Sequence, residues 1–231
     1  MSAAQKITRK ELLKTPDEFL TFSEKAIRYL VEHKQQFTNG LLAVCLVAAL
    51  LIGLRWYMGA KAVKALTAYN AAVAEIPPQG EPDAAKSKAA ALALEKVVAD
   101  YPASGPGRLA SIDLGNLYYS LKEYDKSIAA YQRFLGDVPS EAVHLKPLVL
   151  DSLAQVYAAK GDLHKAVETW ESLLSQEGSL LKAETYLNLG RTYTRLKAPD
   201  KARKAYQDMI EKFPDSAKAA LAKAALAQLG K

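Results

Sequence analysis

The chain has 231 residues, of which 50% are hydrophobic and 24% charged, with only 12 glycines and 10 prolines. This composition is typical of a folded, helix-rich protein. The net charge of +6 is dispersed, and Lys and Arg do not cluster with aromatic residues, which argues against nucleic-acid binding. The single cysteine, Cys45, lies in an apolar run, so no disulfide is expected within the chain.

The first predicted helix begins at Thr15-Pro16-Asp17-Glu18, which has the hydroxyl, proline and glutamate spacing of a capping box. Hydrophobic residues follow at nearly helical spacing up to Val31, with charged residues on the other faces. Three roles stay open for this amphipathic helix. It could lie on a membrane surface, dock on a membrane partner, or extend the next helix as a stalk.

Residues 37–58 form the longest apolar run, FTNGLLAVCLVAALLIGLRWYM, with no charged side chain between Phe37 and Leu54. As a helix rising ~1.5 Å per residue, the run reaches ~33 Å, enough to cross a hydrocarbon core of ~30 Å. We therefore predict one transmembrane helix in contact with membrane lipid. A cleaved signal peptide is the alternative, but the run begins late in the chain and ends in the bulky residues 55–57.

The basic residues close to this span do not decide its direction, because three precede it within about 20 residues and three follow it. These residues are Lys25, Arg28, Lys34, Arg55, Lys61 and Lys64. The distal tail adds further basic residues, which favour a cytoplasmic amino terminus. The domain that follows the span is then expected outside the cytoplasm.

Two helices are predicted between the span and residue 106. Residues 59–76 contain nothing that stops a helix, so the transmembrane helix can continue as a stalk until the prolines and glycine of 77–82. An alanine-rich helix is then predicted from about Ala84 to Tyr101, before the proline- and glycine-containing segment 102–106.

Three later segments align with one another. Each has a small residue, an aromatic residue three positions later, a second small residue and a second aromatic residue. The three sets are Gly115, Tyr118, Ser127 and Tyr131; Ala154, Tyr157, Ala166 and Trp170; and Gly190, Tyr193, Ala202 and Tyr206. The first small residues are 39 and 36 positions apart.

This pattern resembles the tetratricopeptide repeat, a helix-turn-helix hairpin of about 34 residues. The first small residue lets the two helices approach, the aromatic residues fill the core, and the second small residue marks where the returning helix crosses. Closing prolines follow the first and third units at Pro139 and Pro214, whereas the second unit has Gly178. Two other departures are extra residues around 140–146 and Ser127 in place of the usual alanine.

The predicted fold class is all-α, with an N-terminal amphipathic helix, one transmembrane helix and a tetratricopeptide-repeat α-solenoid. Residues 1–36 form a tail, 37–58 the transmembrane helix, and 59–106 a stalk with a degenerate first repeat. The three repeats occupy 107–214. Residues 215–231 are predicted to form a capping helix, which would cover the apolar face of the last hairpin.

No pattern for catalysis or for a cofactor stands out in the sequence. The three histidines are not at metal-ligand spacing with one another or with the cysteine. The segment 105–107 lacks the Lys-Ser/Thr of a phosphate loop, and no G-x-S-x-G motif is present. The sequence therefore predicts a protein without catalytic residues, metal or cofactor.

The resemblance implies a concave groove lined by the first helix of each hairpin, which would hold a protein or peptide segment. The outward positions that it carries over are Ile112, Asn116, Tyr119, Asp151, Gln155, Glu184, Leu187, Arg191 and Arg195. The family's carboxylate clamp for a peptide carboxy terminus is not expected, because Ile112 stands where the family has lysine, although Asn116 would match. Alternatively, these are ordinary solvated residues and partners bind elsewhere.

A short cytoplasmic tail, one span and an external repeat domain also resemble the bacterial ancillary SecYEG translocon subunit family. The resemblance implies an adaptor in the inner membrane, with a periplasmic domain that links translocon components to chaperones or emerging substrates. The alternative is a structural or assembly factor for cell division, pili or the outer membrane, because repeat closures 101–104 and 213–216 resemble those of envelope assembly proteins. A regulatory subunit of an enzyme is a third possibility.

Overall fold

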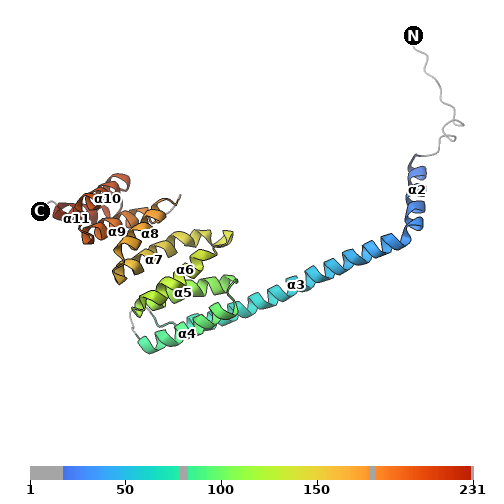
Figure 1. Ribbon diagram of the computed structural model, residues 1–231, viewed down its shortest axis with the longest axis horizontal. Coiled ribbons are helices and arrows are strands. Elements are labelled where there is room, and N and C mark those ends of the chain that lie inside the picture. The colour runs from blue at the N-terminus through green and yellow to red at the C-terminus, as the bar shows by residue number, and fades with distance from the viewer. Residues whose placement is uncertain (1–17, 79–82, 177–179, 230–231) are drawn as a thin grey trace, which may run out of the picture. The chain divides into compact units, whose positions relative to one another are not determined.

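The computed structural model describes residues 18–78, 83–176 and 180–229 (Figure 1). Every regular element among these residues is a helix, which confirms the predicted all-α class. By its internal contacts the chain divides into two compact units, Met1–Ala60 and Lys61–Lys231.

The first unit contains helix α2, Glu18–Glu32, and the beginning of helix α3, Lys34–Ala74. The predicted capping residues 15–17 lie outside the described part of the chain, and α2 is described from Glu18 onward. Ile27, Leu30 and Val31 share one face of α2, and all three are exposed, as the amphipathic pattern predicts.

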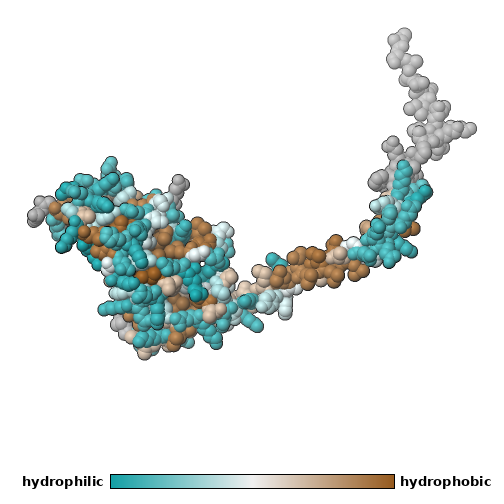
Figure 2. Space-filling model, viewed as in Figure 1, coloured by the Kyte–Doolittle hydropathy of each residue, from teal (hydrophilic) through white to brown (hydrophobic). Residues whose placement is uncertain are grey.

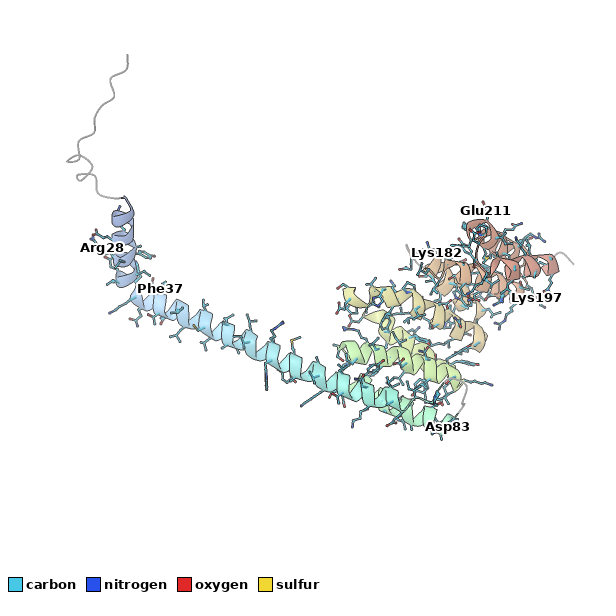
Figure 3. The ribbon with its side chains drawn as sticks, turned by 180° about the vertical axis from the view of Figure 1, so that it is seen from behind. Arg28, Phe37, Asp83, Lys182, Lys197 and Glu211 are labelled. Atoms are coloured by element: carbon cyan, nitrogen blue, oxygen red, sulfur yellow. The ribbon has the colours of Figure 1, made fainter. Side chains whose placement is uncertain are left out.

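The apolar run lies within α3, and its side chains project into the surroundings on every side (Figure 3). Its 18-residue window has a mean hydropathy of 2.3 and is 0% buried. Figure 2 shows this stretch as a continuous hydrophobic band along the helix. Among the described residues, α3 is the one helix long and apolar enough to cross a membrane, a criterion that a signal sequence also meets.

The second unit is a stack of helical hairpins. The first helices of the hairpins are the second part of α3, then α5 (Gly105–Ser120), α7 (Lys146–Lys160) and α9 (Lys182–Arg195). The returning helices are α4 (Ala84–Asp100), α6 (Tyr124–Gly136), α8 (Leu163–Leu174) and α10 (Pro199–Lys212), followed by α11 (Ala219–Leu229). Each helix from α4 to α11 packs on the next one along the chain, which builds the solenoid (Figure 1).

One of the connections that the sequence singles out has a defined structure. The extra residues after Pro139 form a short 3-10 helix, η1 (Ser140–Leu145), before α7. Gly178, which stands where the second unit lacks a proline, lies outside the described residues, as do residues 79–82.

Close helix contact at the two repeat glycines holds each hairpin together. A Cβ atom at Gly115 would overlap the ring of Tyr131, and one at Gly190 would overlap the ring of Tyr206. Ser127 is fully buried, and its hydroxyl donates a hydrogen bond of 2.7 Å to the carbonyl oxygen of Gly115. Serine therefore replaces alanine here without leaving a buried hydroxyl unpaired.

The turn between the two helices of a hairpin has the same form in all three repeats. One residue at each turn has a positive φ: Lys122 (60°), Gly161 (99°) and Lys197 (57°). The amide of the following residue then donates back to a carbonyl on the first helix, at 2.8 to 2.9 Å. These bonds satisfy carbonyl groups that the helix end leaves unpaired.

A repeated tyrosine joins each hairpin to the one before it. The hydroxyls of Tyr118, Tyr157 and Tyr193 are hydrogen-bonded to Glu95, Gln132 and Glu171, which lie on the preceding returning helices. The distance from Gln132 Nε2 to the Tyr157 hydroxyl is 3.1 Å, and from the Tyr193 hydroxyl to Glu171 Oε1 it is 2.6 Å. Burial, and then the neighbouring carboxylate, raises the pKa of both Tyr118 and Tyr193.

The degenerate first hairpin joins the stack through the second part of α3. Ala72 packs with Ala90 and Leu94 of α4 in one hydrophobic cluster. The Tyr69 hydroxyl donates to Asp113 of α5 at 2.8 Å. Burial raises the pKa of the Asp113 carboxyl, and this hydrogen bond partly opposes that shift.

Candidate functional site

The concave side of the stack contains a hollow of about 460 Å³. Its walls come from the first helices α5, α7 and α9, with one residue from α8. The lining residues are Tyr119, Gln155, Ala158, Ala159, Trp170, Glu184, Asn188, Arg191, Thr192 and Arg195. We call this hollow the inner groove.

One end of the inner groove is basic and aromatic. Arg191 and Arg195 are four residues apart on α9, so they share a face, and both side chains are exposed. Within the part of the chain that the structure describes, neither guanidinium forms an ion pair. Tyr119, at the end of α5, is 40% exposed, and its ring centroid lies 6.2 Å from that of Tyr124.

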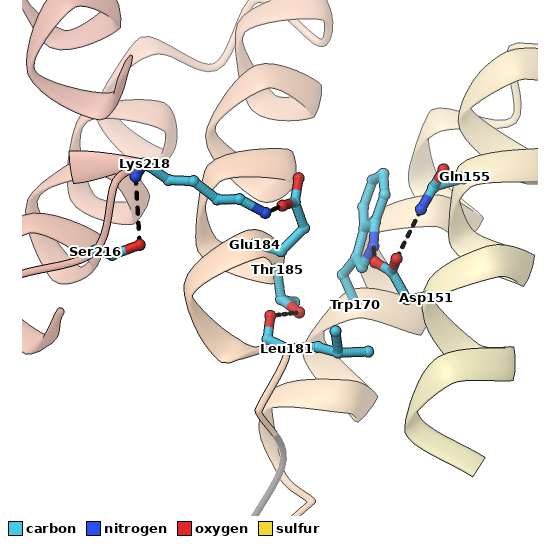
Figure 4. Close-up of polar contacts among 8 residues, drawn as sticks. All are labelled: Asp151, Gln155, Trp170, Leu181, Glu184, Thr185, Ser216 and Lys218. Atoms are coloured by element: carbon cyan, nitrogen blue, oxygen red, sulfur yellow. Dashed lines mark hydrogen bonds and ion pairs between the residues drawn. The ribbon is translucent and has the colours of Figure 1, made fainter. Parts of the chain in front are cut away.

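The floor of the inner groove is held by a buried carboxylate. Asp151 of α7 is only 6% exposed and accepts a hydrogen bond of 2.9 Å from the indole nitrogen of Trp170. Its other oxygen accepts one of 2.6 Å from Gln155 Nε2 (Figure 4). Asp151 therefore orients two lining residues, whereas the prediction placed it on the groove surface.

A second carboxylate of the inner groove is paired across the fold. Glu184 of α9 forms an ion pair with Lys218, which precedes the capping helix α11 (Figure 4). This lysine is 34 positions further along the sequence. Lys218 offsets the charge of Glu184 near the start of α9. The two exposed arginines therefore give the other end of the groove a positive character.

Leu187 is not a groove residue, contrary to the prediction. Its side chain is 1% exposed and packs in a cluster with Tyr206, Met209 and Ala222. The reason is that this face of α9 packs against α10, the returning helix of its own hairpin, in a cluster that also includes Ala222 of α11. The face of α9 that lines the groove follows the spacing of Glu184, Asn188, Arg191 and Arg195.

The two predicted residues on α5 before Tyr119 do not line the inner groove either. Ile112 is partly buried and packs against the central hydrophobic cluster. Asn116 is exposed, and its side-chain oxygen accepts a hydrogen bond of 2.7 Å from the Tyr131 hydroxyl. Five of the nine predicted residues line the hollow, namely Tyr119, Gln155, Glu184, Arg191 and Arg195.

Sequence reasoning missed Ala158, Ala159, Trp170, Asn188 and Thr192 as lining residues. Asn188 could have been found, because it lies between Glu184 and Arg191 on the same helical face. Within the described ranges, no group of three or more His, Cys, Asp or Glu side chains is placed to hold a metal ion. The inner groove offers guanidinium, amide and aromatic groups, which suit non-covalent contacts with a polar or acidic peptide segment.

A stack of helical hairpins with a groove along its first helices defines the class of helical-repeat proteins. Residues 32–231 match the model of the tetratricopeptide repeat-like domain family, and the chain belongs to this family. A tetratricopeptide domain suggests a protein–protein interaction adaptor.

Solved structures with the same fold include a tetratricopeptide repeat protein from Parabacteroides merdae. It is 18% identical, with a TM-score of 0.52 over 63% of this chain and 54% of that one. PilF from Pseudomonas aeruginosa is 14% identical, with a TM-score of 0.52 over 74% of this chain and 69% of that one. At these identities the likeness shows the fold alone.

A curated relative is the outer dynein arm-docking complex subunit 4 of Danio rerio, which is 34% identical over 96 residues. That match spans 41% of this chain but only 18% of the relative. A match to the Homo sapiens intraflagellar transport protein 88 homolog spans 12% of that relative. The chain therefore covers less than a fifth of the length of either curated relative.

Proposed function

We propose that this chain is a non-enzymatic adaptor anchored in the bacterial inner membrane, whose inner groove binds peptide segments of other proteins. The observation that carries this proposal is the exposed pair Arg191 and Arg195 in a hollow that also presents Tyr119. Guanidinium groups form strong, oriented hydrogen bonds with carboxylates, and an aromatic ring adds apolar contact area. The peptide class favoured by these groups is therefore acidic.

The apolar run of α3 supports the membrane anchor in this proposal. Its length and its exposed hydrophobic side chains suit a lipid environment better than water. An anchor would hold the inner groove close to a membrane machine and raise its effective concentration there. The resemblance to the ancillary translocon subunit family suggests that the partners are translocon components and periplasmic chaperones or emerging substrates.

Reversing the charges of Arg191 and Arg195 to glutamate is expected to reduce partner recovery by about tenfold, which corresponds to ~1.4 kcal/mol. The expected cause is repulsion of an acidic peptide from the inner groove. Partners that copurify with the full chain in mild detergent would be quantified by mass spectrometry. Lys88 and Lys204 are exposed and lie outside the groove, so the same reversal at these two lysines is the control. Unchanged recovery with the arginine variant would exclude the basic end of the groove.

The proposed orientation places the amino terminus in the cytoplasm and the repeat domain in the periplasm. Protease added to intact spheroplasts is then expected to digest the carboxy-terminal domain, while a cytoplasmic marker stays whole. A domain that is digested only after lysis would overturn the orientation and, with it, a periplasmic adaptor.

Proximity labelling from the carboxy terminus would identify the partner class. Secretion components in the labelled set are expected for the adaptor, and the same components should copurify in mild detergent. A set made of division, pilus or outer-membrane assembly proteins would instead support an envelope assembly factor. Repeated absence of translocon and chaperone proteins from both experiments would contradict the adaptor.

A further inference from the structure

Exposed large hydrophobic side chains gather at particular places on the second unit. Each first helix of this unit has an exposed hydrophobic residue near its start or in the segment that leads into it. Helix α7 has two such residues, one before its start and one inside it. These residues, with their exposed fractions, are Val63 (65%), Leu109 (38%), Val143 (52%), Leu148 (50%) and Leu180 (99%). Hydrophobic side chains this exposed are unfavourable in water, which raises the question of what covers them.

The topology places these residues at one end of the stack. Consecutive helices are joined by short connections and pack on each other, so the first helices run one way and the returning helices run the other (Figure 1). Every connection from a returning helix to the next first helix therefore lies at the same end. We call this end, which carries Val63, Leu109, Val143, Leu148 and Leu180, the loop edge.

The opposite end of the stack has a different surface. It is formed by the turns around Lys122, Gly161 and Lys197, and no large hydrophobic side chain in these turns is exposed. Figure 3 shows Lys182 of the loop edge and Lys197 of the opposite end at the two ends of α9. Exposed apolar groups are therefore most numerous at the loop edge, while Leu92 in the middle of α4 and Tyr119 near the end of α5 are exposed elsewhere.

Basic residues accompany the hydrophobic residues of the loop edge. They are Lys61, Lys64, Arg108, Lys146 and Lys182. Arg108 Nη2 bonds to Asp137 Oδ2 at 2.8 Å, and Asp100 and Glu141 are further acids at this edge. Lysine and arginine next to exposed leucine and valine make up the composition of a surface that lies in the interface of an anionic bilayer.

The position of the apolar run in the sequence indicates what covers the loop edge. Lys61 opens the second unit at the loop edge and follows Met58 by three residues. Three residues reach at most ~11 Å, whatever angle the two units adopt. If the run crosses a bilayer, the loop edge therefore begins within ~11 Å of chain from the lipid interface.

We propose that the loop edge is a lipid-contacting surface, which rests on an anionic bilayer with its leucine and valine side chains in the headgroup region. This inference rests on the membrane anchor of the proposed function and adds a second membrane contact to it. Such a contact would leave the inner groove, formed by the lengths of the first helices, beside the membrane and open to partners. Lysine and arginine at the same edge would bind lipid phosphate groups.

The test uses the full chain reconstituted in nanodiscs that contain phosphatidylcholine and phosphatidylglycerol, with spin-labelled lipid as a quencher. A polarity-sensitive fluorophore is placed at Leu148→Cys in a Cys45→Ala background. The matched control carries the label at Leu92→Cys, a leucine with 67% exposure in the middle of α4 and away from the loop edge. For a side chain buried ~5–10 Å into the interface, we expect quenching at position 148 about threefold stronger than at position 92.

A label on the native Cys45 separates this inference from the anchor. Strong quenching of Cys45 together with equal, weak quenching at 148 and 92 would overturn the loop-edge proposal and leave the anchor intact. Absence of quenching at Cys45 would overturn both. A label at 148 whose emission is blue-shifted but not quenched by spin-labelled lipid would show a protein partner at the loop edge. That result would also overturn the loop-edge proposal. Loss of quenching at 148 in phosphatidylcholine alone is the result expected from the basic residues.

Discussion

Replacing Leu187 with alanine is expected to lower the free energy of unfolding by about 2–5 kcal/mol. The side chain is 1% exposed and lies in one cluster with Tyr206, Met209 and Ala222, so its removal leaves a cavity in the core of the last hairpin. Neighbouring side chains cannot collapse fully into such a space, and this makes the loss larger than the transfer free energy alone. The effect should be a loss of stability and not a selective loss of partner binding.

Chemical denaturation of the full chain in detergent, followed by circular dichroism of the helices, would measure this change. Leu92→Ala is the matched control, because Leu92 is 67% exposed on α4. A surface change of this kind is expected to alter the free energy of unfolding by no more than about 0.5 kcal/mol. Equal stability of the two variants, with partner recovery lost only for Leu187→Ala, would restore Leu187 to the groove surface.

Alanine at Gly115 or Gly190 is expected to destabilise the fold by about 1–3 kcal/mol, although alanine favours helix formation. The new Cβ would overlap the ring of Tyr131 or Tyr206, which are 1% and 2% exposed. The Tyr131 hydroxyl is bonded to Asn116, so its ring cannot move away without breaking that bond. Strain in the hairpin should therefore exceed the gain in helix propensity.

Gly136→Ala is the control for the two glycine variants. A Cβ atom at Gly136, the last residue of α6, would meet no atom within 4 Å. Its substitution is expected to leave the free energy of unfolding unchanged or slightly raised. Thermal unfolding of the three variants under the same conditions would measure the difference in stability. Gly115→Ala and Gly190→Ala proteins as stable as Gly136→Ala would mean that the rings have room to shift.

The candidate site was predictable where one helix carries the pattern. Arg191 and Arg195 share a face of α9 by spacing alone, and the structure places both in the inner groove. Leu187 was misplaced because helical spacing alone does not say which face of α9 packs against α10. Asp151 was misplaced because its partner, Trp170, lies 19 positions away on the returning helix.

Spacing along the sequence by itself determined the helical class, the repeat period and the apolar run, because each is a pattern of residue types that can be read without knowing which helices pack together. Gly115 and Gly190 also predicted where the two helices of a hairpin approach each other. Tertiary packing alone decided the rest: the pairing of Glu184 with Lys218, the burial of Asp151 and Leu187, and the gathering of exposed leucine and valine at the loop edge. These features join residues far apart in the chain, and their burial depends on which helices cover each face.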